Sequence, residues 1–300
     1  MHRTPAFEAF ISPAREDHAL WRTIVTFLSG FVLYIFWTII LVVVIGAIWG
    51  VGPDFITAMG KLLAGLDRGM TPFDMAVLLA TFIPMAGAAM LMVVLHGRSP
   101  MTLFGVRQNF LRNFIVTAGI IVAFNLIFFA YDKYLGANDL IENLPTLDWA
   151  GYLIWALPLL FIQITAEELV FRGYLLQQLA ARFKSPIWWM VLPSVIFGLG
   201  HIDPTINSAL ALIVVIATIV FGIIAVDLTR ITGNLGAAMG LHLANNFFAL
   251  LVASSSAKMS GLALYRTSYS MQDTEVMIPL MGISIVMLIV VWLIARRVLR

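Results

Sequence analysis

The chain contains no cysteine among its 300 residues. Disulfide bonds, thiolate zinc sites and a cysteine nucleophile are therefore excluded. Charge is also scarce, because Asp, Glu, Lys and Arg together make up 11% of the sequence, against about a quarter in a typical soluble domain. Hydrophobic residues make up 61%, and the mean hydropathy is +0.96. We therefore expect an integral membrane protein whose surroundings are the lipid bilayer.

The small positive charge does not favour nucleic acid as a partner. The formal net charge is +2 and the isoelectric point is about 9.0. In a membrane protein, basic residues mainly mark which loops stay in the cytoplasm. We therefore interpret the basic residues as markers of membrane orientation, and no nucleic-acid partner is expected.

Charge-poor apolar runs recur along the chain at a length near the roughly 20 residues that cross a bilayer as a helix. They lie at about 24–50, 75–95, 113–131, 150–172, 186–202, 206–226, 234–254 and 276–295. The pattern predicts an all-α polytopic fold of about eight transmembrane helices. We expect residues 1–23 to form a cytoplasmic N-terminal tail and residues 24–300 to form one transmembrane domain.

The distribution of basic residues predicts the orientation. An even number of helices puts both termini on one side, and that side carries twelve Lys and Arg residues, including Arg98, Arg107 and Arg112 in one loop without an acid. The other side carries five, and its loop at 132–148 is acidic. The positive-inside rule therefore puts both termini in the cytoplasm, in what we expect to be a bacterial plasma membrane.

Three charged residues interrupt the fourth apolar run. Each of Glu167, Glu168 and Arg172 would cost about 2.5–3.5 kcal/mol at the centre of a membrane helix. Glu168 and Arg172 are four residues apart, with the acid first, which favours an ion pair on one helix face. Glu167 is turned about 100° away from its neighbour. We therefore expect Glu168 to be neutralised by Arg172 and Glu167 to be free for chemistry.

Two further polar groups lie in apolar surroundings, at His201 and at His242 with Asn246. Glu167 and His201 are each 17 residues from Lys184, in the turn between two antiparallel helices. Both should therefore lie about 25 Å from that turn, provided that the helix carrying Glu167 is unbroken. Asn246 shares the helix face of His242. The sequence thus predicts a polar cavity inside the bilayer, with the catalytic core at about 150–250.

These residue types suit the hydrolysis of an amide. A buried glutamate such as Glu167 can take a proton from water, and His201 can orient that water. His242 and Asn246 can donate hydrogen bonds to the oxyanion of a tetrahedral intermediate. The alternative is that each histidine only stabilises the packing of two helices through a hydrogen bond. Asn245 fits packing or support of its neighbours better than catalysis.

Three short motifs follow one another on successive apolar stretches. They are EExxxR at Glu167, Glu168 and Arg172, FxxxH at Phe197 and His201, and HxxxN at His242 and Asn246. Together they resemble the motifs of the CAAX protease and bacteriocin-processing family of intramembrane endopeptidases, also called the abortive-infection family. The resemblance covers about 150–250.

The resemblance implies an eight-helix core with a cavity open to the cytoplasm. It implies that Glu167 is the general base together with His201, that His242 and Asn246 form the oxyanion hole, and that Glu168 and Arg172 support the site. The implied substrate is a membrane-associated or prenylated, CAAX-like peptide.

Metal dependence has two interpretations. Zinc could be held by Glu167, His201 and His242, with a water in the open position. However, the HExxH motif, which places two histidines on one helix face, is absent. Since a carboxylate–histidine pair can activate water unaided, we favour a mechanism without a cofactor and keep Zn²⁺ as the alternative.

A non-enzymatic transporter or proton pathway is the alternative from another functional class, because intramembrane Glu, Arg and His also mark such proteins. It predicts repeat symmetry between the two halves of the chain. The polar intramembrane groups instead all fall in the second half. A scaffold that retains membrane peptides is a third option. The sequence does not indicate an oligomeric state.

Overall fold

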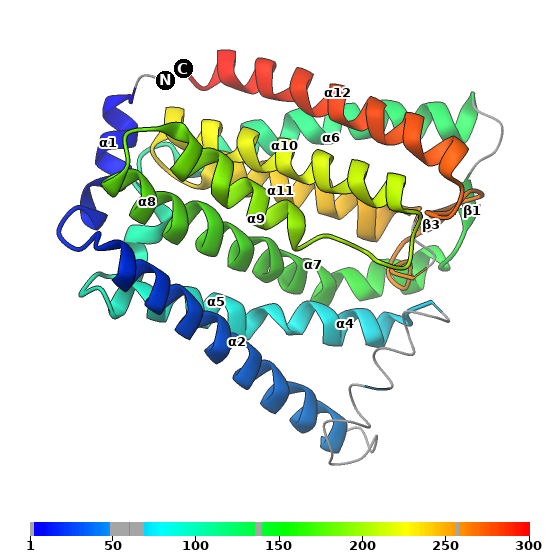
Figure 1. Ribbon diagram of the computed structural model, residues 1–300. Helices are drawn as coiled ribbons and strands as arrows, with labels where there is room; N and C mark the ends of the chain where they lie inside the picture. The colour runs from blue at the N-terminus through cyan, green and yellow to red at the C-terminus, as the bar shows by residue number, and fades with distance from the viewer. Residues whose placement is uncertain (1–2, 49–59, 61–68, 136–139, 256–257) are drawn as a thin grey trace.

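A computed structural model of the chain describes residues 3–48, 60, 69–135, 140–255 and 258–300, most of them helical (Figure 1). Within these described residues, six helical stretches are long and apolar enough to cross a membrane. They are Leu20–Ile48 (α2), Pro72–Val94 (α4 and α5), Phe110–Tyr134 (α6), Thr146–Arg182 (α7 to α8), Ser208–Thr232 (α10) and Thr274–Val298 (α12). The prediction of a polytopic all-α membrane protein is confirmed.

Two shorter apolar helices account for the remaining expected segments. Ile187–Leu199 comprises the π-helical η4 (Ile187–Val191) and α9 (Leu192–Leu199). Gly236–Val252 comprises α11 (Gly236–Phe247) and the π-helical η5 (Phe248–Val252). At about 1.5 Å per residue, the 13 residues of the first stretch reach only part of the way across a bilayer. The predicted eight segments are therefore all helical, but two of them are short.

Local sequence signals explain where several helices begin and end. Thr71 caps α4 (Pro72–Ala80), since its hydroxyl accepts from the Asp74 N–H while the Asp74 carboxylate accepts from the Thr71 N–H. The Asn207 side chain caps α10 by accepting from the Ala209 N–H at 2.9 Å. The same helix ends at Gly233, whose φ of 71° is left-handed.

The N-terminal region contributes a packed element to the domain. Helix α1 (Pro5–Ile11) and the 3₁₀ turn η1 (Ser12–Ala14) fall within the 23 residues that we expected to be a tail. Phe7, Phe10 and Ile11 are fully buried in the core. The Thr4 hydroxyl also donates to the Arg230 carbonyl at 2.7 Å. Part of this region therefore folds onto the helix bundle and closes one end of it.

Polar contacts fix the N-terminal region to the helix that carries the site. His96 Nδ1 donates to the Asp17 carboxylate at 2.7 Å, and its Nε2 lies 2.9 Å from the Tyr174 hydroxyl. Burial lowers the pKa of His96, which favours the neutral ring. Tyr174 thereby connects the chain near Asp17 to the stretch around Arg172.

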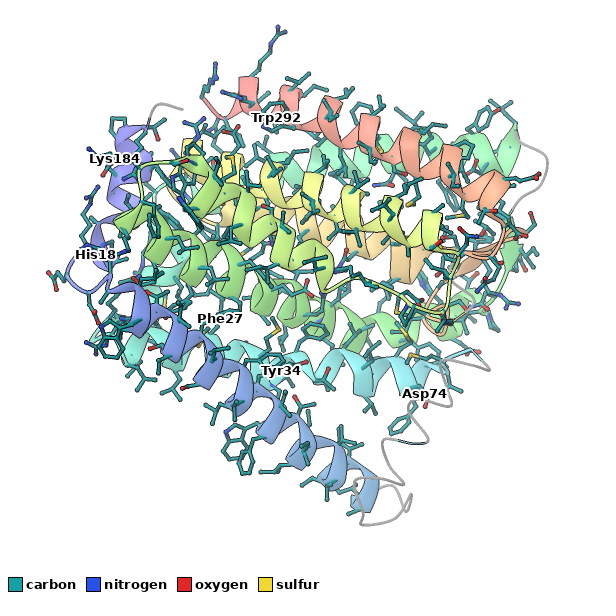
Figure 2. The ribbon with its side chains drawn as sticks, in the orientation of Figure 1. His18, Phe27, Tyr34, Asp74, Lys184 and Trp292 are labelled. Atoms are coloured by element: carbon teal, nitrogen blue, oxygen red, sulfur yellow. The ribbon has the colours of Figure 1, made fainter. Side chains whose placement is uncertain are left out.

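The sequence did not lead us to expect a small β-sheet. β1 (Leu140–Glu142) pairs antiparallel with β3 (Tyr265–Thr267), and β2 (Ala253–Ser254) pairs parallel with the other edge of β3. The sheet lies at the end of the bundle opposite the two chain termini (Figure 1). We call these two ends the sheet end and the termini end. Lys184 and His18 lie at the termini end, and Asp74 lies toward the sheet end (Figure 2).

Helix α11 packs closely against α6 because two glycines face that helix. Gly236 and Gly240 form a GxxxG pair, the spacing that lets membrane helices approach each other closely. A Cβ atom added at either glycine would overlap a backbone carbonyl oxygen of α6, at Phe110 or at Phe114. This contact holds α11, and therefore His242, at a fixed position in the bundle.

We predict that Gly240→Ala destabilises the protein, because the added methyl group would overpack the contact between α6 and α11. The expected loss is about 1–3 kcal/mol, as for other overpacked cores. Gly119→Ala on α6 is the matched control, since no atom lies within 4 Å of its added Cβ. Thermal unfolding in detergent measures both variants. An equal melting temperature for the two would contradict the close-packing argument.

Candidate active site

The helix that carries the two glutamates is continuous through the site. Glu167 and Glu168 are the last residues of α7 (Thr146–Glu168), which passes into the π-helical η3 (Leu169–Leu175) and then into α8 (Leu176–Arg182). The helix therefore runs unbroken past Gly173. This was the condition for placing Glu167 as far as His201 from the turn at Lys184. π-helical turns inside α-helices are frequent at functional sites, and this one carries Arg172.

The expected ion pair between Glu168 and Arg172 is present and completely buried. Arg172 Nη1 donates to Glu168 Oε1 at 3.1 Å, and the two side chains are 1% and 0% exposed. The guanidinium carbon also lies 4.4 Å from the centre of the Phe197 ring and 5.6 Å from that of Phe221. Aromatic faces stabilise a desolvated guanidinium. The pair is thus enclosed by the helices that carry the other motifs.

His242 lies between the two carboxylates. Its Nδ1 is 2.8 Å from Glu168 Oε1, and its Nε2 is 3.3 Å from Glu167 Oε2. A carboxylate only accepts hydrogen bonds, so Nδ1 carries a proton and donates it to Glu168. The Glu168–Arg172 pair therefore also orients the histidine, a role that sequence spacing within one helix did not reveal.

Glu167 has hydrogen-bonding partners other than Arg172. Gln163 Nε2 donates to Glu167 Oε2 at 2.8 Å, in addition to the contact with His242. Gln163 Oε1 in turn accepts from Asn246 Nδ2 at 3.1 Å, and Asn245 Nδ2 donates to Asn246 Oδ1 at 3.2 Å. A buried carboxylate requires such partners. The four-residue spacing of Gln163 and Glu167 puts both side chains on one helix face, which favours this bond.

His201 lies outside this network. Its Nδ1 donates to the Phe197 carbonyl at 2.8 Å, and its ring packs on the Phe197 ring with centroids 4.6 Å apart. In the described part of the chain, no hydrogen bond joins His201 to Glu167. Because Nδ1 is the donor, the neutral ring keeps the lone pair of Nε2 available to accept a proton. The Phe197 ring is the link between His201 and the Arg172 guanidinium.

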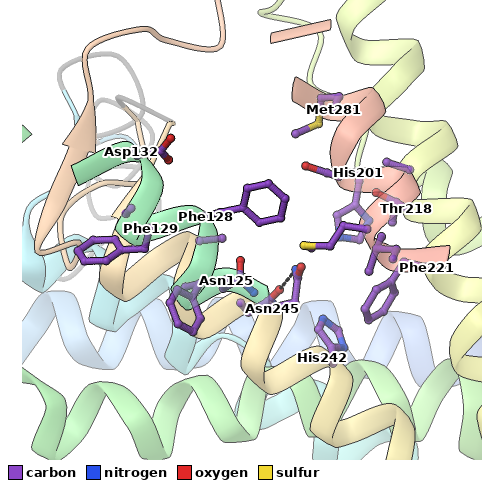
Figure 3. A pocket seen from close by; sticks show the side chains of 18 of the residues that line it. Asn125, Phe128, Phe129, Asp132, His201, Thr218, Phe221, His242, Asn245 and Met281 are labelled. Carbon is purple, nitrogen blue, oxygen red and sulfur yellow. Dashed lines mark hydrogen bonds between the residues drawn. The ribbon is translucent and has the colours of Figure 1, made fainter. Parts of the chain in front are cut away.

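A cavity of about 400 Å³ brings three of the four expected catalytic residues to one surface. His201, His242 and Asn246 line it, and His242 forms part of its floor (Figure 3). Glu167 does not belong to the lining and lies next to His242 and Gln163. A cavity therefore lies beside the motif residues, lined by both polar and aromatic side chains, with the glutamate next to its floor.

The donor geometry does not fit the zinc alternative. Among the described residues, no group of three or more His, Cys, Asp or Glu side chains is arranged to hold a metal ion. Glu167, His201 and His242 do not form the compact ligand set that tetrahedral zinc requires. We therefore derive no step through a metal.

Comparison with known proteins supports the resemblance seen in the motifs. Residues 149–248, about a third of the chain, match the family model described as "Type II CAAX prenyl endopeptidase Rce1-like". A curated relative from Bacillus subtilis (strain 168), named "Uncharacterized protein YyaK", is 36% identical over 104 residues. That alignment covers 33% of this chain and 34% of the relative. No solved structure shows a significant match.

We predict that the two neighbouring glutamates differ in their effect on stability. Glu168→Gln should destabilise the protein by about 3–5 kcal/mol, because it leaves the buried Arg172 without its counter-charge. Glu167→Gln should change stability little, since an amide oxygen can still accept from Gln163. Thermal unfolding of both variants in the same detergent measures the difference. Equal losses would show that the two carboxylates do not have separate roles.

Proposed function

We propose that the chain is an intramembrane endopeptidase of the CAAX type, which hydrolyses a peptide bond of a membrane-associated peptide. The observation that carries this proposal is the linkage of Glu167, His242 and Asn246 in one hydrogen-bonded network that reaches the cavity surface. The match of residues 149–248 to an endopeptidase family model supports the same class of reaction. Prenylated, CAAX-like peptides are one kind of substrate within this class.

In the proposed reaction, Glu167 accepts a proton from the attacking water. His201 lines the cavity with the lone pair of Nε2 available, so it can hold and orient that water. The hydroxide attacks the scissile carbonyl carbon, and the carbonyl oxygen becomes an oxyanion. Glu167 then returns the proton to the leaving amine, so that no net proton is consumed during peptide-bond cleavage.

His242 and Asn246 are proposed to stabilise the oxyanion. Asn246 uses one amide hydrogen on Gln163, and its second hydrogen is left to donate to substrate. His242 donates from Nδ1 to Glu168, which fixes its ring with Nε2 beside Glu167. With a proton on Nε2, the ring can donate a hydrogen bond to the oxyanion during reaction. Glu168 and Arg172 act through His242, as positioning residues.

We predict that Glu167→Gln abolishes cleavage. Asn246→Ala should lower turnover by about 10²–10³, the effect that the loss of one oxyanion-hole donor has in other proteases. Asn245→Ala is the comparison on the same helix; because Asn245 reaches the network only through its hydrogen bond to Asn246 Oδ1, its loss should lower turnover by less than the loss of Asn246. Cleavage of quenched fluorescent CAAX-like and non-prenylated membrane peptides in proteoliposomes provides the measurement. An active Glu167→Gln variant would contradict the role of Glu167 as the base.

Removal of metal tests the glutamate mechanism against its zinc alternative. We expect the purified protein to retain full activity after exhaustive chelation, because the proposed steps use only its own side chains. Metal content is counted on the same sample, and His201→Ala and His242→Ala are compared with the unchanged protein. Activity that disappears on chelation and returns with one equivalent of Zn²⁺ would establish the metalloprotease mechanism instead.

A further inference from the structure

A second hollow, of about 430 Å³, lies at the termini end of the bundle, where Figure 2 labels Lys184. Its charged lining consists of Arg3, Glu8, Arg15, Arg182 and Lys184. No residue belongs both to this lining and to that of the cavity beside the candidate active site. Four cationic side chains face one carboxylate, so the hollow has a surplus of positive charge and attracts an anion.

The two cations from the N-terminal region are held in place by their neighbours. Arg3 Nη2 donates to the carbonyls of Ala180 and Phe183, at 2.8 and 2.5 Å. These carbonyls lie at the C-terminal end of α8, where a helix favours a positive charge. The Glu8 carboxylate pairs with Arg15 and also lies 3.6 Å from Arg3 Nη1. Because one carboxylate is shared by two guanidinium groups, it does not neutralise the hollow.

The other two cations, Arg182 and Lys184, are available to a ligand. Both are exposed, and in the described part of the chain neither forms an ion pair with an acidic side chain. Their charges add to those of Arg3 and Arg15, and an anion between them relieves the repulsion among like charges. A phosphate group offers several acceptor oxygens, and a guanidinium can bind two of them at once. A phosphate-bearing ligand therefore fits this hollow.

The surface beside the hollow is apolar and aromatic. The chain continues from Lys184 into η4, where the side chains of Ile187 and Trp188 are 62% and 47% exposed. The Trp188 ring packs on that of Phe183, which lines the hollow, with centroids 5.3 Å apart. Exposed apolar side chains continue along α9 as far as Leu199. Since tryptophan is enriched at the depth of lipid headgroups, the hollow lies at that depth, beside a surface suited to acyl chains.

We infer that the hollow binds the phosphate headgroup of an anionic phospholipid, whose acyl chains lie along the exposed face of η4 and α9. Basic pockets at the cytoplasmic ends of membrane helices bind such headgroups, and the basic residues predict that the termini end is cytoplasmic. The lipid therefore belongs to the leaflet on that side. The inference does not depend on the proposed peptidase activity.

The bound lipid connects two parts of the chain that lie far apart in the sequence. It contacts the N-terminal region through Arg3 and Arg15 and the turn between α8 and η4 through Arg182 and Lys184. This turn joins the helix that carries the two glutamates to the helix that leads to His201. Binding of the lipid should therefore stabilise the packing of the N-terminal region on this pair of helices.

Replacement of the two available cations tests the inference. The double variant Arg182→Gln with Lys184→Gln removes two exposed charges from the hollow, and Lys184→Gln alone is the second variant in case the first folds poorly. Arg107→Gln with Arg297→Gln is the matched control, because it removes two exposed cations at the same end of the bundle but outside the hollow. Native mass spectrometry of the purified full chain, titrated with dioleoyl phosphatidylglycerol, measures the affinity for the first lipid.

We expect each removed cation of the hollow to weaken binding about fivefold, which is the contribution of one Lys or Arg near an anionic lipid surface. The matched control should bind phosphatidylglycerol as the unchanged protein does. Phosphatidylcholine should bind more weakly to the unchanged protein, because its choline group neutralises the phosphate. Glycerol 1-phosphate, which has no acyl chains, should also bind more weakly, since it buries no apolar surface.

Equal weakening in the double variant and in the matched control would overturn the inference, because it would show only diffuse attraction to this end of the protein. Binding of inorganic phosphate or glycerol 1-phosphate as tightly as the lipid would assign the hollow to a soluble phosphate instead. Displacement of the lipid by an acidic peptide at equal concentration would assign it to a protein partner. Either result would overturn the assignment to a phospholipid.

Discussion

The structure depends on the neutralisation of charge inside a bilayer. Glu168, Arg172 and His242 form a buried cluster in which Glu168 Oε1 accepts from both other groups, and removal of Glu168 or Arg172 leaves an uncompensated charge. The cluster joins α7 with its π-helical continuation to α11, and the Phe197 ring extends it to α9. The helices that carry the three motifs are thus held together by the groups that the motifs supply.

Close helix packing also positions the residues of the proposed catalytic site. Gly236 and Gly240 bring α11 against α6, and this approach places His242 opposite both glutamates. From there the hydrogen bonds continue through Gln163 to Asn246 at the cavity surface. In the proposed mechanism, Glu167 therefore acts beside His242 within one connected network, and not as an isolated base.

The helices around the cavity also pack against one another below it. Helices α6, α10, α11 and α12 share a continuous apolar cluster, and the Asp227 carboxylate accepts from Trp292 Nε1, which holds α10 against α12. The cavity adjoins this cluster, and its lining combines His201, His242 and Asn246 with several aromatic side chains.

The sequence by itself determined the apolar helical segments, the Glu168–Arg172 pair and the motif residues, because hydropathy and spacing within one helix are local properties. The contact between His242 and both carboxylates, the bond from Gln163 to Asn246, the separation of His201 from Glu167 and the small sheet were decided only by tertiary structure. The side-chain contacts depend on the distance and the rotation at which separate helices pack, and the sheet depends on which distant segments meet. Sequence spacing carries no information on the rotation of one helix against another.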